Sequence, residues 1–312
     1  MNKKKFNRVL VVLGGTSGER AISLESGKAC IKALKKKGYK VFTFDPKFEK
    51  FNLKNKKKLD VIFNALHGRD GEDGVAQSYF EYLKVPYTHS GVISSFTAMN
   101  KIYSKKIFIK NKIKTPKFIS ITKFDIKKKN IYKILKNKKT AFPIVLKPVN
   151  EGSSLGVEVC KDKKTMNKSI NRLLKKYDEL ILEEYIEGQE IQVAVINGTP
   201  LGAIELIPKR MFYDYKAKYT KKAKTEHVMP ARLSKKKYKE VLNISKKAHQ
   251  ALNCKGVTRS DFKFYKNNFY LLEINTQPGM TSLSLVPEIA HFRGISFENL
   301  VEKILLDASI NR

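Results

Sequence analysis

Two segments near the carboxyl end carry residue types that could hold a metal ion. Arg259 and Asp261 lie on one strand candidate and Glu273 and Asn275 on the next, joined across the turn Lys266-Asn267-Asn268, which predicts a hairpin. Side chains alternate along a strand, so each pair shares one face. If the two faces coincide, two carboxylates, an amide oxygen and a guanidinium converge. This set suits Mg²⁺, with the arginine offsetting charge on a phosphoryl group or an oxyanion; a solvated polar face on an edge hairpin is the alternative.

A glycine- and serine-rich loop is the second candidate. It runs from Glu151 to Gly156 and follows Lys147-Pro148. Small residues at this density let backbone N–H groups approach an anion, and a preceding lysine can contact phosphates. The loop lacks the Gly-x-x-x-x-Gly-Lys-Ser/Thr spacing of a Walker A loop, and a plain hairpin connection is an equally good interpretation.

Glu19 follows another glycine-rich stretch, Gly14 to Gly18, which comes directly after the first strand candidate. The stretch does not match Gly-x-Gly-x-x-Gly, which argues against a nicotinamide site. Glu19 would lie at the start of a helix, where the macrodipole favours a carboxylate. It is therefore either a helix-stabilising acid or a ligand contact.

Two further segments favour functional loops. His67 lies among three glycines and four charged residues, just past the carboxyl end of a strand candidate, where ligands bind in open α/β sheets. The segment Phe212 to Tyr219 is aromatic and basic without clear periodicity. It is either plain surface or a mobile loop that closes over ligands.

The elements around these candidates predict an α/β chain with some α+β character. The apolar run Val9 to Leu13 is typical of a strand buried in a parallel sheet, and Gly38 would end the helix expected at about 22–37. Strand candidates at 41–44 and 61–66 complete a β-α-β opening unit.

Further strand candidates divide the rest of the chain. Those at 143–147 and 156–160 flank the Glu151 to Gly156 loop, and those at 180–186 and 191–196 are joined through Glu187-Gly188. A length of 312 residues with 42% apolar content allows two or three domains. The expected division is 1–96, 97–180 and 181–312.

The charge balance is strongly basic, with 63 Lys and Arg against 29 Asp and Glu and a formal net charge of +34. Clustered basic residues would suggest nucleic-acid binding. The lysines here are spread in short runs, none of which adjoins a base-stacking aromatic pattern or a helix-turn-helix signature. We therefore expect no nucleic-acid partner, although the net field would attract anions such as nucleotides.

Cysteine usage and hydropathy predict the compartment. Three cysteines without Cys-x-x-Cys spacing indicate buried thiols in a reducing environment. The apolar run at Val9 to Leu13 is too short for a signal peptide, and no run approaches membrane-spanning length. We expect a cytoplasmic protein without a membrane partner.

In this order, the segments resemble a D-alanine–D-alanine ligase along nearly the whole chain. The matching stretches are 14–20, 65–74, 147–148 with 151–156, 212–219, 256–261 and 272–287 (LEINTQPGMTSLSLVP). The resemblance implies a three-domain ATP-grasp fold with a Rossmann-like amino-terminal domain and with ATP held between the other two domains. One departure is Asn100, where the family usually has aspartate.

The resemblance also implies a role for each matching residue. ATP would be bound by Lys101, Lys147, Glu183, Glu184, Ile186, Glu190 and Lys218. Two Mg²⁺ or Mn²⁺ ions would be held by Asp261, Glu273 and Asn275. The two D-alanine molecules would be bound by Glu19, His67, Arg259, Gly279, Ser284 and Leu285. The catalytic group would be Glu19, Ser153, Tyr219, Arg259 and Gly279, in which Glu19, Ser153 and Tyr219 form a hydrogen-bonded cluster that closes two loops.

The implied reaction forms D-alanyl-D-alanine for peptidoglycan synthesis, through a D-alanyl phosphate and with release of ADP and phosphate, in an enzyme that is usually a homodimer. Two alternatives stay open. A D-alanine–D-lactate ligase would share the nucleotide site, but the lid with Tyr219 resembles the dipeptide-forming type. A basic nucleic-acid-binding protein on an ATP-grasp scaffold is the other, and a salt-dependent gel shift would reveal it.

Overall fold

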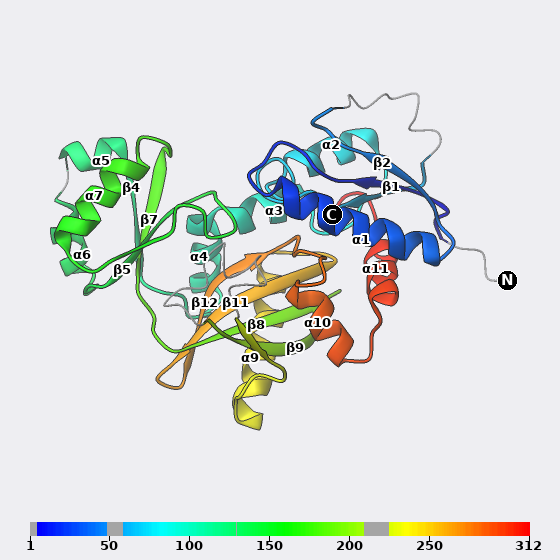
Figure 1. The fold of residues 1–312 in the computed structure, drawn as a ribbon. Coiled ribbons are helices and arrows are strands. Elements are labelled where there is room, and N and C mark those ends of the chain that lie inside the picture. Colours follow the sequence, from blue (N-terminus) through cyan, green and yellow to red (C-terminus); the bar gives the residue numbers. More distant parts are fainter. Residues whose placement is uncertain (1–4, 49–58, 129, 209–224) are drawn as a thin grey trace.

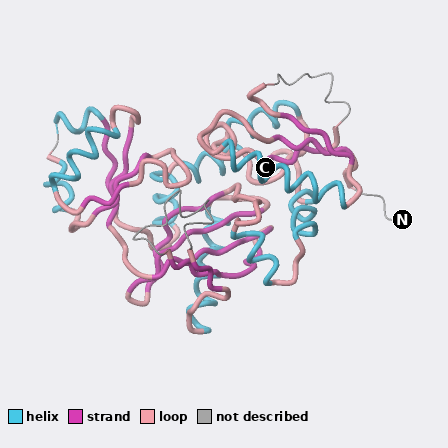
Figure 2. Tube along the Cα trace, in the orientation of Figure 1, coloured by secondary structure: helices cyan, strands magenta, loops and turns pink. Residues whose placement is uncertain are grey.

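The computed structural model describes residues 5–48, 59–128, 130–208 and 225–312, which form three β-sheets with helices packed against them (Figure 1). The strands gather into three groups in Figure 2. The expected α/β class is confirmed. Within the described ranges, no helix has the length and apolar character needed to cross a bilayer.

The N-terminal sheet is parallel, with strand order β2-β1-β3. Its strands are β1 (Arg8–Val12), β2 (Lys40–Phe44) and β3 (Val61–Asn64). Helix α1 (Arg20–Lys36) begins directly after Glu19 and ends two residues before Gly38, which has a left-handed φ of 74°. The turn from β1 into α1 therefore brings Glu19 to the carboxyl edge of the sheet.

The last helix of the chain packs against this first unit. Helix α11 (Phe297–Leu306) contacts α1 and lies next to it in Figure 1, and its Leu300, Val301 and Ile304 share a buried core with Val9 and Leu34. Helix α2 (Val75–Leu83) packs through Phe80 and Leu83 with Leu10 and Ile62. The same core includes Ile204 and Ile289, so residues 297–306 pack both against the N-terminal unit and against the third domain of the expected division.

The central sheet has the order β4-β7-β5-β6 and is antiparallel throughout. Its strands are β4 (Phe118–Thr122), β5 (Ile144–Pro148), β6 (Glu158–Cys160) and β7 (Glu179–Glu184). Its helices are α5 (Lys123–Lys128), α6 (Ile131–Asn137) and α7 (Lys163–Leu173). β5 and β6 are the hairpin expected around the glycine-rich loop.

β7 falls across the expected boundary between residues 180 and 181. Both of its partners, β4 and β5, belong to the central sheet, so the strand pairing favours a boundary after Glu184. The strand expected next, β8, pairs with other strands in a different sheet. Glu187-Gly188 therefore connects two sheets and is not a hairpin turn.

The C-terminal sheet has the order β10-β9-β8-β11-β12. Its strands are β8 (Gln189–Ile196), β9 (Thr199–Ile207), β10 (Glu226–Val228), β11 (Val257–Tyr265) and β12 (Asn268–Asn275). Along β8, Val193 and Val195 share a core with helix α9 (Lys235–Ala251), whereas Ala194 and Ile196 share one with α10 (Leu285–Phe292). Both faces of this strand are buried because helices cover both sides.

Two helices link the N-terminal unit to the other sheets. They are α3 (Val92–Met99) and α4 (Lys101–Lys110), and both contact β12. Asn100 caps α4, since its side-chain oxygen accepts hydrogen bonds from the backbone N–H groups of Ile102 and Tyr103 at 3.1 and 3.0 Å. Asparagine and aspartate cap helices about equally well, so the departure from the family pattern leaves Lys101 held at the helix start.

Candidate active site

The β11–β12 hairpin brings four polar side chains to one face. Arg259 pairs with Asn275 and Asp261 with Glu273 in the strand register, so the predicted coincidence of the two faces is confirmed. Arg259 binds Asp261 through two contacts, Nε to Oδ1 at 2.7 Å and Nη2 to Oδ2 at 2.9 Å. Two carboxylates and an amide oxygen form a donor set that fits a hard cation such as Mg²⁺, which completes its coordination with phosphate oxygens or water.

Among the described residues no group of three or more His, Cys, Asp or Glu side chains is arranged to hold a metal. The hairpin offers only two acids, and its third oxygen comes from the Asn275 amide. A cation here would therefore depend on ligand oxygens, as expected where Mg²⁺ binds together with a nucleotide.

A pocket of about 890 Å³ lies between the central sheet and this hairpin. Its apolar part includes Val145, Val157 and Leu272, and its polar part includes Asp261 and Glu273. Six of the predicted ATP-binding residues line it, namely Lys101, Lys147, Glu183, Glu184, Ile186 and Glu190. The seventh, Lys218, lies outside the described residues.

Three lysines and two glutamates form a buried ionic cluster at the polar end of this pocket. Lys147 Nζ lies 2.8 Å from Glu183 Oε2, Lys105 Nζ lies 3.1 Å from Glu183 Oε1, and Lys101 Nζ lies 3.7 Å from Glu273 Oε2. Lys101 also donates a hydrogen bond to the backbone carbonyl of Glu151 at 2.5 Å. The loop expected to bind phosphate is thereby tied to helix α4.

Burial and charge act in opposite directions on the pKa values of this cluster. Burial alone would raise the pKa of Glu183, but Lys105 and Lys147 outweigh it and the pKa is lowered. For Lys147 the pKa is raised, because the attraction of Glu183 and Glu273 exceeds the effect of burial. Burial dominates at Lys105 and lowers its pKa to about 8. Glu183 is therefore a carboxylate despite being 2% exposed.

A second pocket, of about 520 Å³, adjoins the first and shares Lys101, Glu151 and Glu273 with it. Besides Lys101 and Glu273, the predicted residues that line it are Glu19, Ser153, Arg259 and Asn275. A methyl group added at Gly152 would lie 2.5 Å from Glu19 Oε1, so the glycine-rich loop passes directly against this carboxylate. Glu19 and Ser153 are thus brought to one pocket; Tyr219, the third member of the predicted cluster, lies outside the described residues.

His67 lies beside this pocket without lining it. Its Nε2 is 3.2 Å from Ser26 Oγ, and its carbonyl accepts a hydrogen bond from Ser17 Oγ at 2.6 Å. His67 instead lines a third pocket of about 770 Å³ at the carboxyl edge of the N-terminal sheet. Burial lowers the pKa of His67 to about 4, so the ring is neutral at neutral pH.

Gly279 and Ser284 lie between β12 and α10, and Leu285 is the first residue of α10. Ser284 Oγ accepts a hydrogen bond from the backbone N–H of Thr281 at 2.9 Å, and an added methyl at Gly279 would lie 2.8 Å from that same Oγ. Leu285 is buried in the core, and α10 begins at its backbone. None of the three lines either of the first two pockets, so the structure does not bring them together with Glu19 and Arg259 in one pocket.

Four residues that line these pockets or contact neighbouring groups were not among the predicted set. Lys263 lies 3.0 Å from Glu190 in the first pocket, and Glu72 lines the second. Lys105 lies one helical turn after Lys101, a spacing that places both on one face of α4. Gln277 donates to the backbone carbonyl of Leu66 and accepts a 2.8 Å hydrogen bond from Asn64 Nδ2, which joins the end of β12 to the N-terminal sheet. No local pattern in the sequence distinguishes Gln277, because its partners lie more than 200 residues away.

Comparisons with known proteins agree with this geometry. Residues 107–306 match the family model "D-ala D-ala ligase C-terminus", and residues 43–90 match "D-ala D-ala ligase N-terminus". A protein of Pelagibacter ubique named D-alanine–D-alanine ligase is 56% identical over 307 residues, which cover 98% of this chain and 99% of the relative. One of Trichlorobacter lovleyi with the same name is 42% identical over 309 residues, covering 98% and 96%.

A solved structure shares the architecture. The D-alanine–D-alanine ligase from Bacillus anthracis complexed with ATP superposes with a TM-score of 0.84 at 31% identity, covering 96% of this chain and 97% of that one. The expected ATP-grasp fold is therefore confirmed. With both family models matched and relatives that align from end to end, this chain belongs to the D-alanine–D-alanine ligase family.

Proposed function

We propose that this chain joins two D-alanine molecules into D-alanyl-D-alanine and converts ATP to ADP and phosphate. One observation carries the proposal: the lysine-lined pocket and the pocket with Glu19 and Arg259 meet at Lys101, Glu151 and Glu273. A nucleotide in the first pocket would present its terminal phosphate at the mouth of the second. An amino acid bound there would have its carboxylate next to that phosphate.

In the first step, the carboxylate of one D-alanine attacks the γ-phosphate of ATP, which releases ADP and forms the D-alanyl phosphate. Lys101 and Lys147 offset the charge on the phosphates. Glu190 binds the ribose, and Glu183, Glu184 and Ile186 line the adenine pocket. Asp261, Glu273 and Asn275 would hold two Mg²⁺ or Mn²⁺ ions, which neutralise phosphate charge when bound. Glu19 binds the ammonium group of this D-alanine, and His67 supports its carboxylate end.

In the second step, the amine of the other D-alanine attacks the acyl phosphate, and phosphate leaves. Arg259 and the backbone N–H of Gly279 stabilise the tetrahedral oxyanion, with Ser284 and Leu285 binding the incoming molecule. The ion pair with Asp261 holds the Arg259 guanidinium in place before the charge develops. Ser153 and Tyr219 close over Glu19, and Lys218 contacts phosphate from the same lid, which excludes water from the acyl phosphate.

The proposal extends to the compartment and the oligomeric state of the enzyme. We place it in the cytoplasm, as a homodimer that supplies the dipeptide for peptidoglycan precursors. Size-exclusion chromatography with light scattering tests the dimer directly. A monomer at micromolar concentration would contradict the proposed homodimer but not the proposed reaction.

The decisive test measures phosphate release from ATP and Mg²⁺ with D-alanine, with L-alanine, or with D-alanine plus D-lactate, followed by mass spectrometry of the product. Release only where D-alanine is present, together with the dipeptide mass, is the expected result. A depsipeptide in the mixed reaction would point to a D-alanine–D-lactate ligase. If folded protein binds ATP but releases no phosphate in response to D-alanine, the substrates would be a different carboxylate and a different amine.

A further inference from the structure

Ser26 carries a buried hydroxyl that takes no part in the reaction proposed above. It lies on α1 and is 1% exposed, and its Oγ accepts a 3.1 Å hydrogen bond from the backbone N–H of Met280. The same oxygen lies 3.2 Å from Nε2 of His67. One hydroxyl therefore joins helix α1, the loop after β3 and the loop between β12 and α10.

The directions of these hydrogen bonds follow from the donors that are present. A serine hydroxyl has one hydrogen and two acceptor lone pairs. Because Oγ of Ser26 accepts from Met280, its hydrogen is left for Nε2 of a neutral His67 ring. Burial lowers the pKa of that ring to about 4, and a hydrogen bond with the backbone of Gln277 acts in the opposite direction, as a carbonyl that accepts a ring proton does. The ring is thus held on one side by α1 and on the other by the loop after β12.

The loop that Ser26 contacts carries the backbone N–H proposed to stabilise the oxyanion. That N–H belongs to Gly279, which directly precedes Met280. A methyl group added at Gly279 would lie 2.8 Å from Ser284 Oγ and 4.0 Å from Ile22 Cγ2, one turn before Ser26 on α1. Glycine has no side chain of its own to anchor it, so contacts of its neighbours must set the orientation of its peptide group.

Gly279 has an attachment to the N-terminal unit on each side. Two residues before it, the side-chain carbonyl of Gln277 accepts a 2.8 Å hydrogen bond from Asn64 Nδ2. One residue after it, the N–H of Met280 donates to Ser26. If the second attachment is lost, the peptide group of Gly279 is held from one side only and can turn.

We propose that Ser26 is a positioning residue that fixes the peptide group of Gly279 for the second step of the reaction. The inference rests on the proposed function, which assigns the oxyanion of that step to Gly279. A donor that is held in place before charge develops stabilises the transition state without having to reorient. Ser26 should therefore matter more for attack by the second D-alanine than for phosphoryl transfer from ATP.

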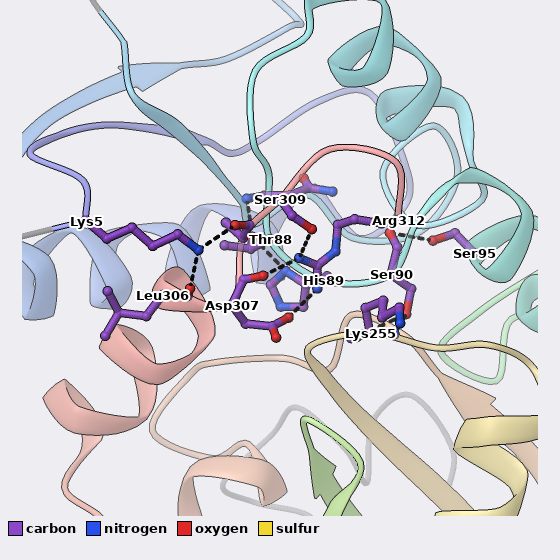
Figure 3. A network of polar contacts seen from close by, with 12 residues as sticks. Lys5, Thr88, His89, Ser90, Ser95, Lys255, Leu306, Asp307, Ser309 and Arg312 are labelled. Carbon is purple, nitrogen blue, oxygen red and sulfur yellow. Dashed lines mark hydrogen bonds and ion pairs between the residues drawn. The ribbon is translucent and has the colours of Figure 1, made fainter.

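The test compares Ser26→Ala with Ser90→Ala, the matched control. Ser90 is 0% exposed, and its Oγ accepts a 3.1 Å hydrogen bond from the backbone N–H of Lys255, so it also joins the N-terminal unit to a loop of the C-terminal unit. Figure 3 shows its polar network, and none of the residues labelled there is assigned to the reaction. Both variants lose one buried hydroxyl, so a general loss of stability would affect them alike.

Positional isotope exchange reports on the first step separately. Reversible formation of the acyl phosphate exchanges the β,γ-bridge oxygen of ATP with the non-bridge oxygens of the β-phosphate, and a slower second step lets more acyl phosphate return to ATP. Ser26→Ala should lower turnover about tenfold or more and raise the ratio of isotope exchange to net phosphate release by a similar factor. The KM for ATP should stay within about twofold of wild type, and Ser90→Ala should keep the wild-type ratio. An equal fall of exchange and release in Ser26→Ala would refute the positioning role.

Hydrogen–deuterium exchange without substrates tests the attachment itself. Ser26→Ala should speed exchange of the Met280 amide about tenfold, whereas Ser90→Ala should leave it at the wild-type rate. If Ser26→Ala does not fold, Ser26→Cys replaces the hydroxyl with a weaker donor and acceptor and should change both measurements in the same directions by a few fold. An unchanged rate at Met280 would overturn the inference. Because this measurement needs no turnover, it stands even if the dipeptide assay fails.

Discussion

Arg259 and Asp261, two residues apart on β11, bind each other through two contacts of 2.7 and 2.9 Å while facing the same pocket edge as Glu273 and Asn275. The planar guanidinium is therefore oriented before any substrate arrives. This preorganisation is the reason that arginine, and not another cation, suits the position.

Arg259→Lys keeps the positive charge but loses the two-point contact. We expect turnover at saturating ATP and D-alanine to fall about 10²–10³-fold, the usual effect of removing one oxyanion donor. Phosphate release and thermal unfolding are measured side by side. Turnover within twofold of wild type would show that charge alone suffices.

Gly152→Ala tests the close approach of the glycine-rich loop to Glu19. The added methyl would lie 2.5 Å from Glu19 Oε1, so the loop or the carboxylate must shift. We expect the KM for D-alanine to rise about tenfold, since a displacement of about 1 Å weakens a charge-assisted contact strongly.

Gly198→Ala is the control for this substitution. Gly198 has φ of 73° and nothing within 4 Å of an added methyl, so the change costs about 1 kcal/mol of backbone strain without affecting the site. Its KM should match wild type. An equal rise in KM for both variants would mean that a general loss of stability explains the effect.

Gln277→Ala tests the link between the hairpin and the N-terminal sheet. Gln277 is 1% exposed and bonds to Asn64 and to the Leu66 carbonyl, so its truncation removes one buried hydrogen-bond partner from each of these groups. The free energy of unfolding should fall by about 2–3 kcal/mol. Exposed Gln250→Ala should change it by less than about 0.5 kcal/mol. Urea denaturation gives both values, and equal values would contradict a linking role.

Stability should fall as the pH is lowered from about 6.5 to 4. Burial lowers the pKa of His249 to about 4, whereas an unfolded chain binds that proton near pH 6.5. The unfolded state therefore takes up the proton first as the pH falls through this range, and His249 alone contributes about 2 kcal/mol to the stability difference between pH 7 and pH 5. His249→Gln should reduce that difference by this amount, measured by urea denaturation at both pH values.

Exposed His291→Gln is the matched control for the loss of an imidazole. It should retain the wild-type difference between pH 7 and pH 5. If His249→Gln leaves the stability difference between pH 7 and pH 5 unchanged, the native state binds a proton at His249 as readily as the unfolded state does.

Local patterns in the sequence determined the short-range features of this protein. Alternation along each strand placed Arg259 with Asp261 and Glu273 with Asn275 on one face, whereas a register shift between Asp261 and Phe262, which the turn does not dictate, brings the two pairs opposite each other. The apolar run at Val9 to Leu13 predicted a buried parallel strand, and Glu19 was correctly expected at a helix start. These features follow from residue periodicities of 2 and 3.6 and from the residues that form turns. Such patterns are local and can be read from about ten consecutive residues.

Only the tertiary structure decided which distant elements share a surface. β7 joined the central sheet, α11 packed on α1, and Lys105 met Glu183 although their positions in the sequence showed no connection. Such contacts depend on how sheets and helices bury their apolar faces against one another. This arrangement depends on residues throughout the chain. This packing also determines which buried charged groups form ion pairs, because each buried charge needs a partner within contact distance. The sequence alone therefore predicted the chemical groups and the family, whereas the packing of the three sheets determined which groups meet.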